Sequence, residues 1–142
     1  MDLIGRGIIA GFLATLALSA MVEPLNALAH NAALRPPAFA WVVHFFVGSF
    51  IWGGAFALLQ PLARGPFWLR GLVFGILAWI VATALAMAAT RAGVFGFNRG
   101  FATPAVLLVV HALYGTLLGT IFGLLGPREH DINDTPMRPS HR

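Results

Sequence analysis

The chain has no cysteine and no lysine, and only 10% of its 142 residues are charged. The absence of cysteine excludes disulfides, thiolate metal sites and cysteine nucleophiles. Because a soluble domain carries about a quarter charged residues, the low charge argues against a cytosolic enzyme, a disordered regulator and a nucleic-acid-binding protein. The nine basic residues are all arginines and lie singly between apolar runs, as topology signals of a membrane protein do.

Hydrophobic residues make up 58% of the chain and are concentrated in four long runs. A bilayer core about 30 Å thick needs roughly 20 apolar residues in a helix. The runs that are long enough cover residues 7–29, 39–62, 69–90 and 104–126. Since backbone groups in lipid must be satisfied within their own segment, we expect four helices. The sequence therefore predicts an all-α integral membrane four-helix bundle over residues 1–126 and a disordered polar tail over residues 127–142.

Arginines are distributed unevenly between the two sides of this topology. The side with both termini holds six of them: Arg6, Arg64, Arg70, Arg128, Arg138 and Arg142. The opposite side holds three: Arg35, Arg91 and Arg99. The positive-inside rule then places both termini in the cytoplasm. The first run also imitates a secretory signal that ends near Ala29, but its length and Glu23-Pro24 argue against cleavage.

The two halves of the chain resemble each other. Spans one and three align at an offset of 64, which matches Arg6-Gly7 with Arg70-Gly71. Spans two and four align at an offset of 67, which matches Val42-Val43-His44 with Val109-Val110-His111. We interpret the chain as two duplicated helical hairpins, related by a pseudo-two-fold axis along the membrane normal.

Three ionisable residues lie at membrane depth: Glu23, His44 and His111. At a rise of about 1.5 Å per residue, all three lie within roughly 6–9 Å of the outer face. The repeat mate of Glu23 is Met87. Because ionisable residues in a membrane usually face the bundle interior, we expect one layer that contains Glu23, His44, Met87 and His111, one from each helix.

Each of the two histidines is followed one turn later by a glycine, Gly48 or Gly115, and several ligands fit this pattern. One is haem b, with His44 and His111 as axial ligands and the macrocycle against the two glycines. A second is a transition metal held by the two histidines, Glu23 and Met87. A third is a proton or quinone site. The alternative is that the histidines only hold helices together by hydrogen bonds.

Small residues predict where the helices approach closely. The pattern Gly115-x-x-x-Gly119-x-x-x-Gly123 indicates a helix–helix contact in span four. In span two, Gly48, Trp52 and Phe56 follow one another at four-residue intervals, so we expect them on one helix face with Trp52 opposite Gly119.

These features give the chain a resemblance to a known family. The motifs are V-V-H-F-x-x-G with Trp52-Gly53 in span two, Trp68-Leu69-x-Gly71 in span three and His111-x-x-Tyr114-Gly115 in span four. They are similar to those of small four-helix bacterial inner-membrane proteins grouped as a domain of unknown function. The resemblance implies a multi-pass protein of the bacterial cytoplasmic membrane, and it implies no activity.

The sequence favours a structural or accessory role without catalytic residues. The chain is then a small partner of a larger membrane complex, or a homo-oligomer, and binds no nucleic acid. The alternative is a b-type haem or quinone-linked electron-transfer module that uses His44 and His111, or a metal-binding membrane protein. A Soret band in the purified protein distinguishes the haem alternative from the structural role.

Overall fold

The computed structural model describes residues 1–28, 38–88 and 101–126, and every regular element in them is helical. The elements are α1 (Leu3–Leu28), α2 (Ala38–Phe46), the π-helix η2 (Val47–Gly53), α3 (Gly54–Leu59), the 3₁₀-helix η3 (Gln60–Leu62), α4 (Phe67–Ala88) and α5 (Ala102–Leu124). Four stretches are long and apolar enough to cross a membrane: Leu3–Met21, Ala38–Leu62, Phe67–Leu85 and Pro104–Leu124. The predicted all-α fold with four spans is confirmed. The predicted tail and the loops that hold Arg35, Arg91 and Arg99 lie outside the described residues.

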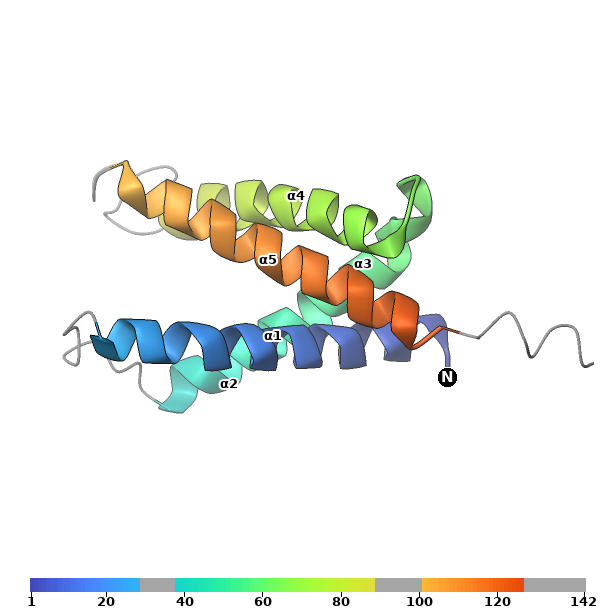
Figure 1. Ribbon diagram of the computed structural model, residues 1–142, viewed down its shortest axis with the longest axis horizontal. Helices are drawn as coiled ribbons and strands as arrows, with labels where there is room; N and C mark the ends of the chain where they lie inside the picture. Colours follow the sequence, from blue (N-terminus) through green and yellow to red (C-terminus); the bar gives the residue numbers. More distant parts are fainter. Residues whose placement is uncertain (29–37, 89–100, 127–142) are drawn as a thin grey trace, which may run out of the picture.

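The four spans alternate in direction (Figure 1). The start of α1, the turn after η3 and the end of α5 all lie at one end of the molecule. In that turn Gly65 has a φ of 100°, a conformation that L side chains rarely adopt. This short turn brings α4 back into the bundle directly after the second span.

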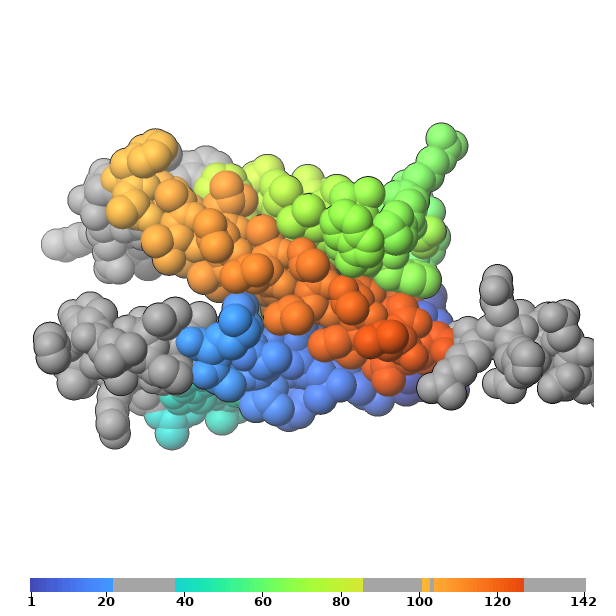
Figure 2. All heavy atoms as spheres, viewed as in Figure 1, coloured from blue at the N-terminus to red at the C-terminus, as the bar shows by residue number. Residues whose placement is uncertain are grey.

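The helices form two hairpins that cross each other. In the N-terminal hairpin, α1 packs against η2 and α3, and in the C-terminal hairpin α4 packs along α5. The hairpins meet through α1 and α5, and α5 approaches α1 toward its own C-terminal end (Figure 1). In the space-filling view, α5 lies directly on α1 at that end (Figure 2).

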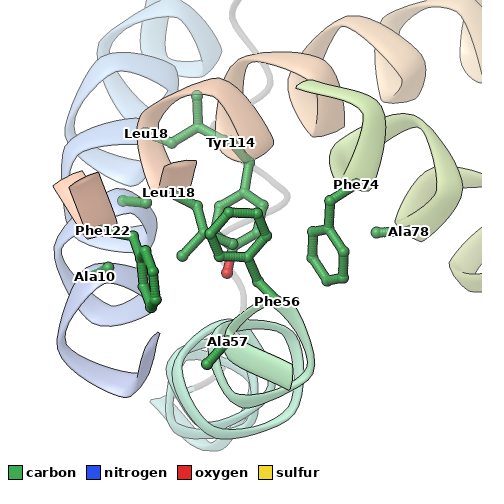
Figure 3. Packing of buried hydrophobic residues seen from close by; sticks show 10 residues of the cluster. Ala10, Leu18, Phe56, Ala57, Phe74, Ala78, Tyr114, Leu118 and Phe122 are labelled. Atoms are coloured by element: carbon green, nitrogen blue, oxygen red, sulfur yellow. The ribbon is translucent and has the colours of Figure 1, made fainter. Parts of the chain in front are cut away.

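The buried core contains aromatic side chains from both hairpins, packed among alanines and leucines (Figure 3). Phe56 and Phe122 are completely buried, and their rings meet edge to face with centroids 5.3 Å apart. The Phe74 ring lies 5.4 Å from Phe56, again in a T-shaped arrangement. Such edge-to-face contacts suit the ring quadrupoles, so this cluster joins span two, α4 and α5.

Span two differs from the uniform α-helix that the sequence suggested. The π-helix η2 contains seven residues, Val47–Gly53, and separates α2 from α3. A π-turn holds one residue more than an α-turn, so Gly48 and Gly53, five apart, lie on the same side of the helix. Trp52 and Phe56 both pack against Phe74, with ring centroids 6.1 Å and 5.4 Å apart, so these two residues share one side of the span. Gly119 faces Gly71 of α4, so the prediction of Trp52 opposite Gly119 is wrong.

Candidate functional site

Glycines allow α4 and α5 to approach at the level of their backbones. A Cβ atom added to Gly119 would lie 2.9 Å from the Cα of Gly71, and one added to Gly115 would lie 2.7 Å from the Cα of Gly75. No real Cβ tolerates such distances, so only glycine fits these positions. The predicted contact at Gly115 and Gly119 is confirmed.

A second glycine contact joins α1 to span two. A Cβ atom added to Gly11 would lie 3.0 Å from the Cα of Gly53, and one added to Gly7 would lie 2.7 Å from the Cβ of Ala57. Gly48 faces the Thr15 side chain. The backbone of Gly48 is therefore covered by α1, and that of Gly115 by α4.

One buried tyrosine connects the two hairpins in the middle of the spans. The Tyr114 hydroxyl on α5 donates a hydrogen bond of 2.5 Å to the carbonyl oxygen of Gly48 in η2. Beside it, the Thr15 hydroxyl donates to the Gly11 carbonyl at 2.8 Å. Tyr114 and Thr15 are only 8% and 2% exposed. Because water cannot compete at this depth, the Tyr114 bond fixes the two hairpins relative to each other.

His44 lies on the exposed surface of α2. Its Nε2 atom is 3.4 Å from the Ser19 hydroxyl of α1, and its ring lies edge-on to Trp41 and Phe45, with centroids 5.8 Å and 5.9 Å away. The hydrogen bond to Ser19 joins the two helices of the N-terminal hairpin. The ring contacts fix the orientation of two neighbouring aromatic side chains.

His111 is half-buried on α5, and its imidazole forms a hydrogen bond within its own helix. Its Nδ1 atom donates to the Leu107 carbonyl at 2.8 Å. Helix α2, which carries His44, packs against α1 and η2, whereas α5 packs against α4 and α1. Each imidazole is thus bonded inside its own hairpin, and a ligand shared by His44 and His111 stays a prediction.

The other two residues of the predicted layer are described only by their backbones. Glu23 lies in α1 and Met87 in α4, and their side chains lie outside the described part of the structure. Within the described residues, no group of three or more His, Cys, Asp or Glu side chains could hold a metal ion. The four-residue layer, and with it the haem and metal hypotheses, therefore stays a prediction.

Two arginines bind across the hairpins near the end that holds the N-terminus. Arg6 donates to the Phe122 carbonyl at 2.9 Å, and its guanidinium lies 4.1 Å from the centroid of the Phe122 ring. Arg70 donates to the Gln60 side chain at 2.8 Å and to the Gly65 carbonyl at 2.7 Å. A cation near the C-terminal carbonyls of a helix also interacts favourably with the helix dipole. Each arginine thus reaches from the first helix of its own hairpin to the second helix of the other.

Comparison with known sequences agrees with this architecture. The model of the Family of unknown function (DUF6789) matches residues 1–132. The chain belongs to this family. No curated protein and no solved structure matches it. Membership of DUF6789 confirms the resemblance to a family of unknown function and assigns no activity.

The role of Tyr114 in this DUF6789 member is absent from the predictions made from its sequence. Tyr114 is the single tyrosine of the chain and lies inside an apolar run. A tyrosine at such depth needs a partner for its hydroxyl, which is a signal that could have marked it. The partner itself, the Gly48 carbonyl, could not be predicted without the rotation of span two.

Proposed function

We propose that this protein is a structural or accessory membrane protein, either a small partner of a larger membrane complex or a homo-oligomer. The proposal rests on which groups accept the hydrogen bonds of the hydroxyl side chains. The hydroxyls of five buried or membrane-embedded residues donate to backbone carbonyls of the bundle itself: Thr15, Thr83, Tyr114, Thr116 and Thr120. Groups used in this way stabilise the helices and their packing and are not presented to a substrate.

We further propose that the bundle lies in the bacterial cytoplasmic membrane with both termini in the cytoplasm. Support comes from the six arginines assigned to one side against three on the other. Reporter fusions after Pro127 and within residues 93–102 test the orientation. The two fusions should give opposite signals, and the C-terminal fusion should be active only with a reporter that works in the cytoplasm. An extracytoplasmic C-terminus would refute the proposal.

The two hairpins are proposed to be copies of one duplicated unit. Both pack glycine against glycine, and both have an arginine directly before the first contact glycine, Arg6 and Arg70. Gly53 lies against Gly7 and Gly11 as Gly115 lies against Gly71 and Gly75. A Cβ atom added to Gly11 would also meet the carbonyl oxygen of Gly48, five residues before Gly53, whereas one added to Gly75 would meet that of His111, four residues before Gly115. The additional residue of span two therefore lies in η2.

Absorption spectroscopy, metal analysis and mass measurement of the detergent-purified full chain test the accessory role. The protein should be colourless, contain metal well below one ion per chain, and form a particle heavier than one 15.2 kDa chain after the detergent is subtracted. A Soret band that disappears in His44→Ala and His111→Ala would instead establish the haem module. Metal bound at one ion per chain would favour the metal-binding alternative, and a monodisperse single chain would contradict the accessory role.

A further inference from the structure

Two arginines at the end of the bundle that holds the N-terminus carry positive charges without a negative partner in the described structure. Arg6 and Arg70 donate to backbone carbonyls and to a glutamine side chain, all of which are neutral. Asp2 has the only carboxylate side chain among the described residues, and it accepts a hydrogen bond from the backbone N–H of Gly5 at 2.7 Å. Because uncompensated charge is unfavourable in a membrane, this end of the bundle favours an anionic ligand.

The aromatic core fixes the positions of both guanidinium groups. That of Arg6 lies 4.1 Å from the centroid of the Phe122 ring, and that of Arg70 lies 4.9 Å from the centroid of the Phe67 ring. The centroids of the two rings are 5.6 Å apart. The ring pair therefore connects the two arginines across the end of the bundle. A guanidinium that is already held in place loses less freedom when it binds a ligand than a mobile one does.

Both arginines have hydrogen-bond donors to spare. A guanidinium has five N–H donors. Arg6 uses one of them, from Nη2, and Arg70 uses two, from Nε and Nη1. The Nε atom of Arg6 is buried, so a ligand does not reach it. The Nη1 atom of Arg6 and the Nη2 atom of Arg70 have no partner in residues 1–28, 38–88 and 101–126 and are not buried, so these two groups are accessible donors.

The depth of the arginines indicates which anion they meet. Each is the fourth residue of its span, Arg6 in Leu3–Met21 and Arg70 in Phe67–Leu85. At a rise of about 1.5 Å per residue, both lie about 5 Å inside the end of the span. Phospholipid head groups begin at this edge, and guanidinium groups bind phosphate through strong, paired hydrogen bonds. Basic groups between transmembrane helices are typical sites for anionic lipid head groups.

We propose that Arg6 and Arg70 together bind the head group of an anionic phospholipid. The phosphate oxygens accept from Nη1 of Arg6 and Nη2 of Arg70, and the acyl chains remain in the bilayer. Two cations without a counter-ion favour a lipid with net negative charge over a zwitterionic one. The proposal depends neither on the accessory role nor on which side of the membrane this end of the bundle faces.

Native mass spectrometry of the full chain, released from detergent with added phosphatidylglycerol or phosphatidylcholine, tests the site. Phosphatidylglycerol should bind about fivefold more tightly or better. Arg6→Gln and Arg70→Gln should each weaken its binding about five- to tenfold. Arg64→Gln is the matched control, because it removes the same charge from the same end, where the exposed Arg64 side chain forms no hydrogen bond or ion pair with the described residues. Its effect should be less than about twofold.

Four results would overturn the proposal, and two of them need the wild type alone. The first is equal affinity for the two lipids, and the second is displacement of phosphatidylglycerol by inorganic phosphate at the same concentration, which would indicate a site for a free anion. The third is an equal loss in Arg64→Gln and in the other two variants, which would indicate diffuse attraction. The fourth is binding that is absent in the wild type and appears when Glu129, Asp131 and Asp134 are replaced by their amides, which would assign the arginines to the acidic residues after the last span.

Discussion

The N-terminal and C-terminal hairpins both pack glycine against glycine, but the second helix of the N-terminal hairpin contains a π-helical turn and that of the C-terminal hairpin does not. In α5 the contact glycines Gly115 and Gly119 are four residues apart, as a regular α-helix requires. In span two the glycines that contact α1, Gly48 and Gly53, are five residues apart, and both belong to the π-helix η2. The wider turn keeps both glycines against α1, so the close helix contact is preserved although the sequence is one residue longer.

The irregular turn is also where the hairpins are joined by a hydrogen bond. The carbonyl that accepts from Tyr114 belongs to Gly48, inside η2. In the C-terminal hairpin Gly115 faces α4, as Gly53 faces α1 in the N-terminal hairpin. A π-turn disturbs the regular backbone hydrogen bonding of the helix, and here one of its carbonyls bonds the opposite hairpin. The comparison teaches that the irregular hairpin supplies the acceptor and the regular hairpin supplies the donor.

The largest difference between the two hairpins is expected when a single residue is deleted from the second helix of each. Removal of Ile51, which is exposed in η2, gives Gly48 and Gly53 the four-residue spacing of α5. A regular α-turn returns the Gly48 carbonyl to the helix and weakens its bond from Tyr114, so the free energy of unfolding should fall by about 1–3 kcal/mol. Removal of Leu117 rotates Gly119 by about 100° relative to Gly115 and should cost more than about 4 kcal/mol. Thermal unfolding in detergent measures both, and equal losses would contradict the assignment of the additional residue to η2.

A single methyl group should distinguish the contact glycines from a glycine in open space. Gly119→Ala places a Cβ against the backbone of α4 and should lower the free energy of unfolding by about 2–3 kcal/mol. Gly54→Ala is the matched control, since a Cβ there meets nothing within 4 Å. Its melting temperature should stay constant or rise slightly, because alanine is the better helix former. A comparable loss in both variants would mean that glycine contacts do not determine the stability of the hairpins.

Removal of the Tyr114 hydroxyl should weaken the connection between the hairpins. Tyr114→Phe leaves the Gly48 carbonyl without this donor and should cost about 1–3 kcal/mol, the usual penalty for a buried unsatisfied group. Thr120→Val removes an exposed hydroxyl on the same helix and should cost about 0.5 kcal/mol or less. Denaturant unfolding followed by tryptophan fluorescence measures both variants. If Tyr114→Phe is as stable as the wild type, the bond does not hold the hairpins together.

The smallest effect is expected at the arginine contacts. Arg6→Gln removes the hydrogen bond to the Phe122 carbonyl and the contact with the Phe122 ring, and should lower the free energy of unfolding by about 1 kcal/mol. Arg64→Gln, in the exposed turn between the hairpins, should have almost no effect. Melting temperatures of the two variants in the same detergent make the comparison. A larger loss for Arg64→Gln would contradict the cross-hairpin role of Arg6.

Much of the fold could be predicted because a membrane imposes simple rules on sequence. Each span follows from length and hydropathy alone, and the glycines at four-residue spacing in span four indicate the contact with α4. The π-turn could not be predicted in this way, because every residue from Val47 to Gly53 is also compatible with an α-helix.

The surroundings of the histidines could not be deduced, because depth is encoded in the sequence but rotation about the helix axis is not. His44 and His111 were placed at one depth, yet their hydrogen bonds go to Ser19 and to the Leu107 carbonyl.

The contact between Arg6 and Phe122 has a consequence for biogenesis. Its donor and acceptor are 116 residues apart, so a ribosome inserts almost the whole chain before the acceptor exists. Since chains are made from the N-terminus onward, the first hairpin can pair through its own glycines while the Arg6 guanidinium still contacts water or lipid head groups. The Arg6 contact can form only when the last turn of α5 has been inserted. A chain truncated before Phe122 would leave the Arg6 guanidinium exposed, and this exposure would distinguish an incompletely assembled chain from a complete one.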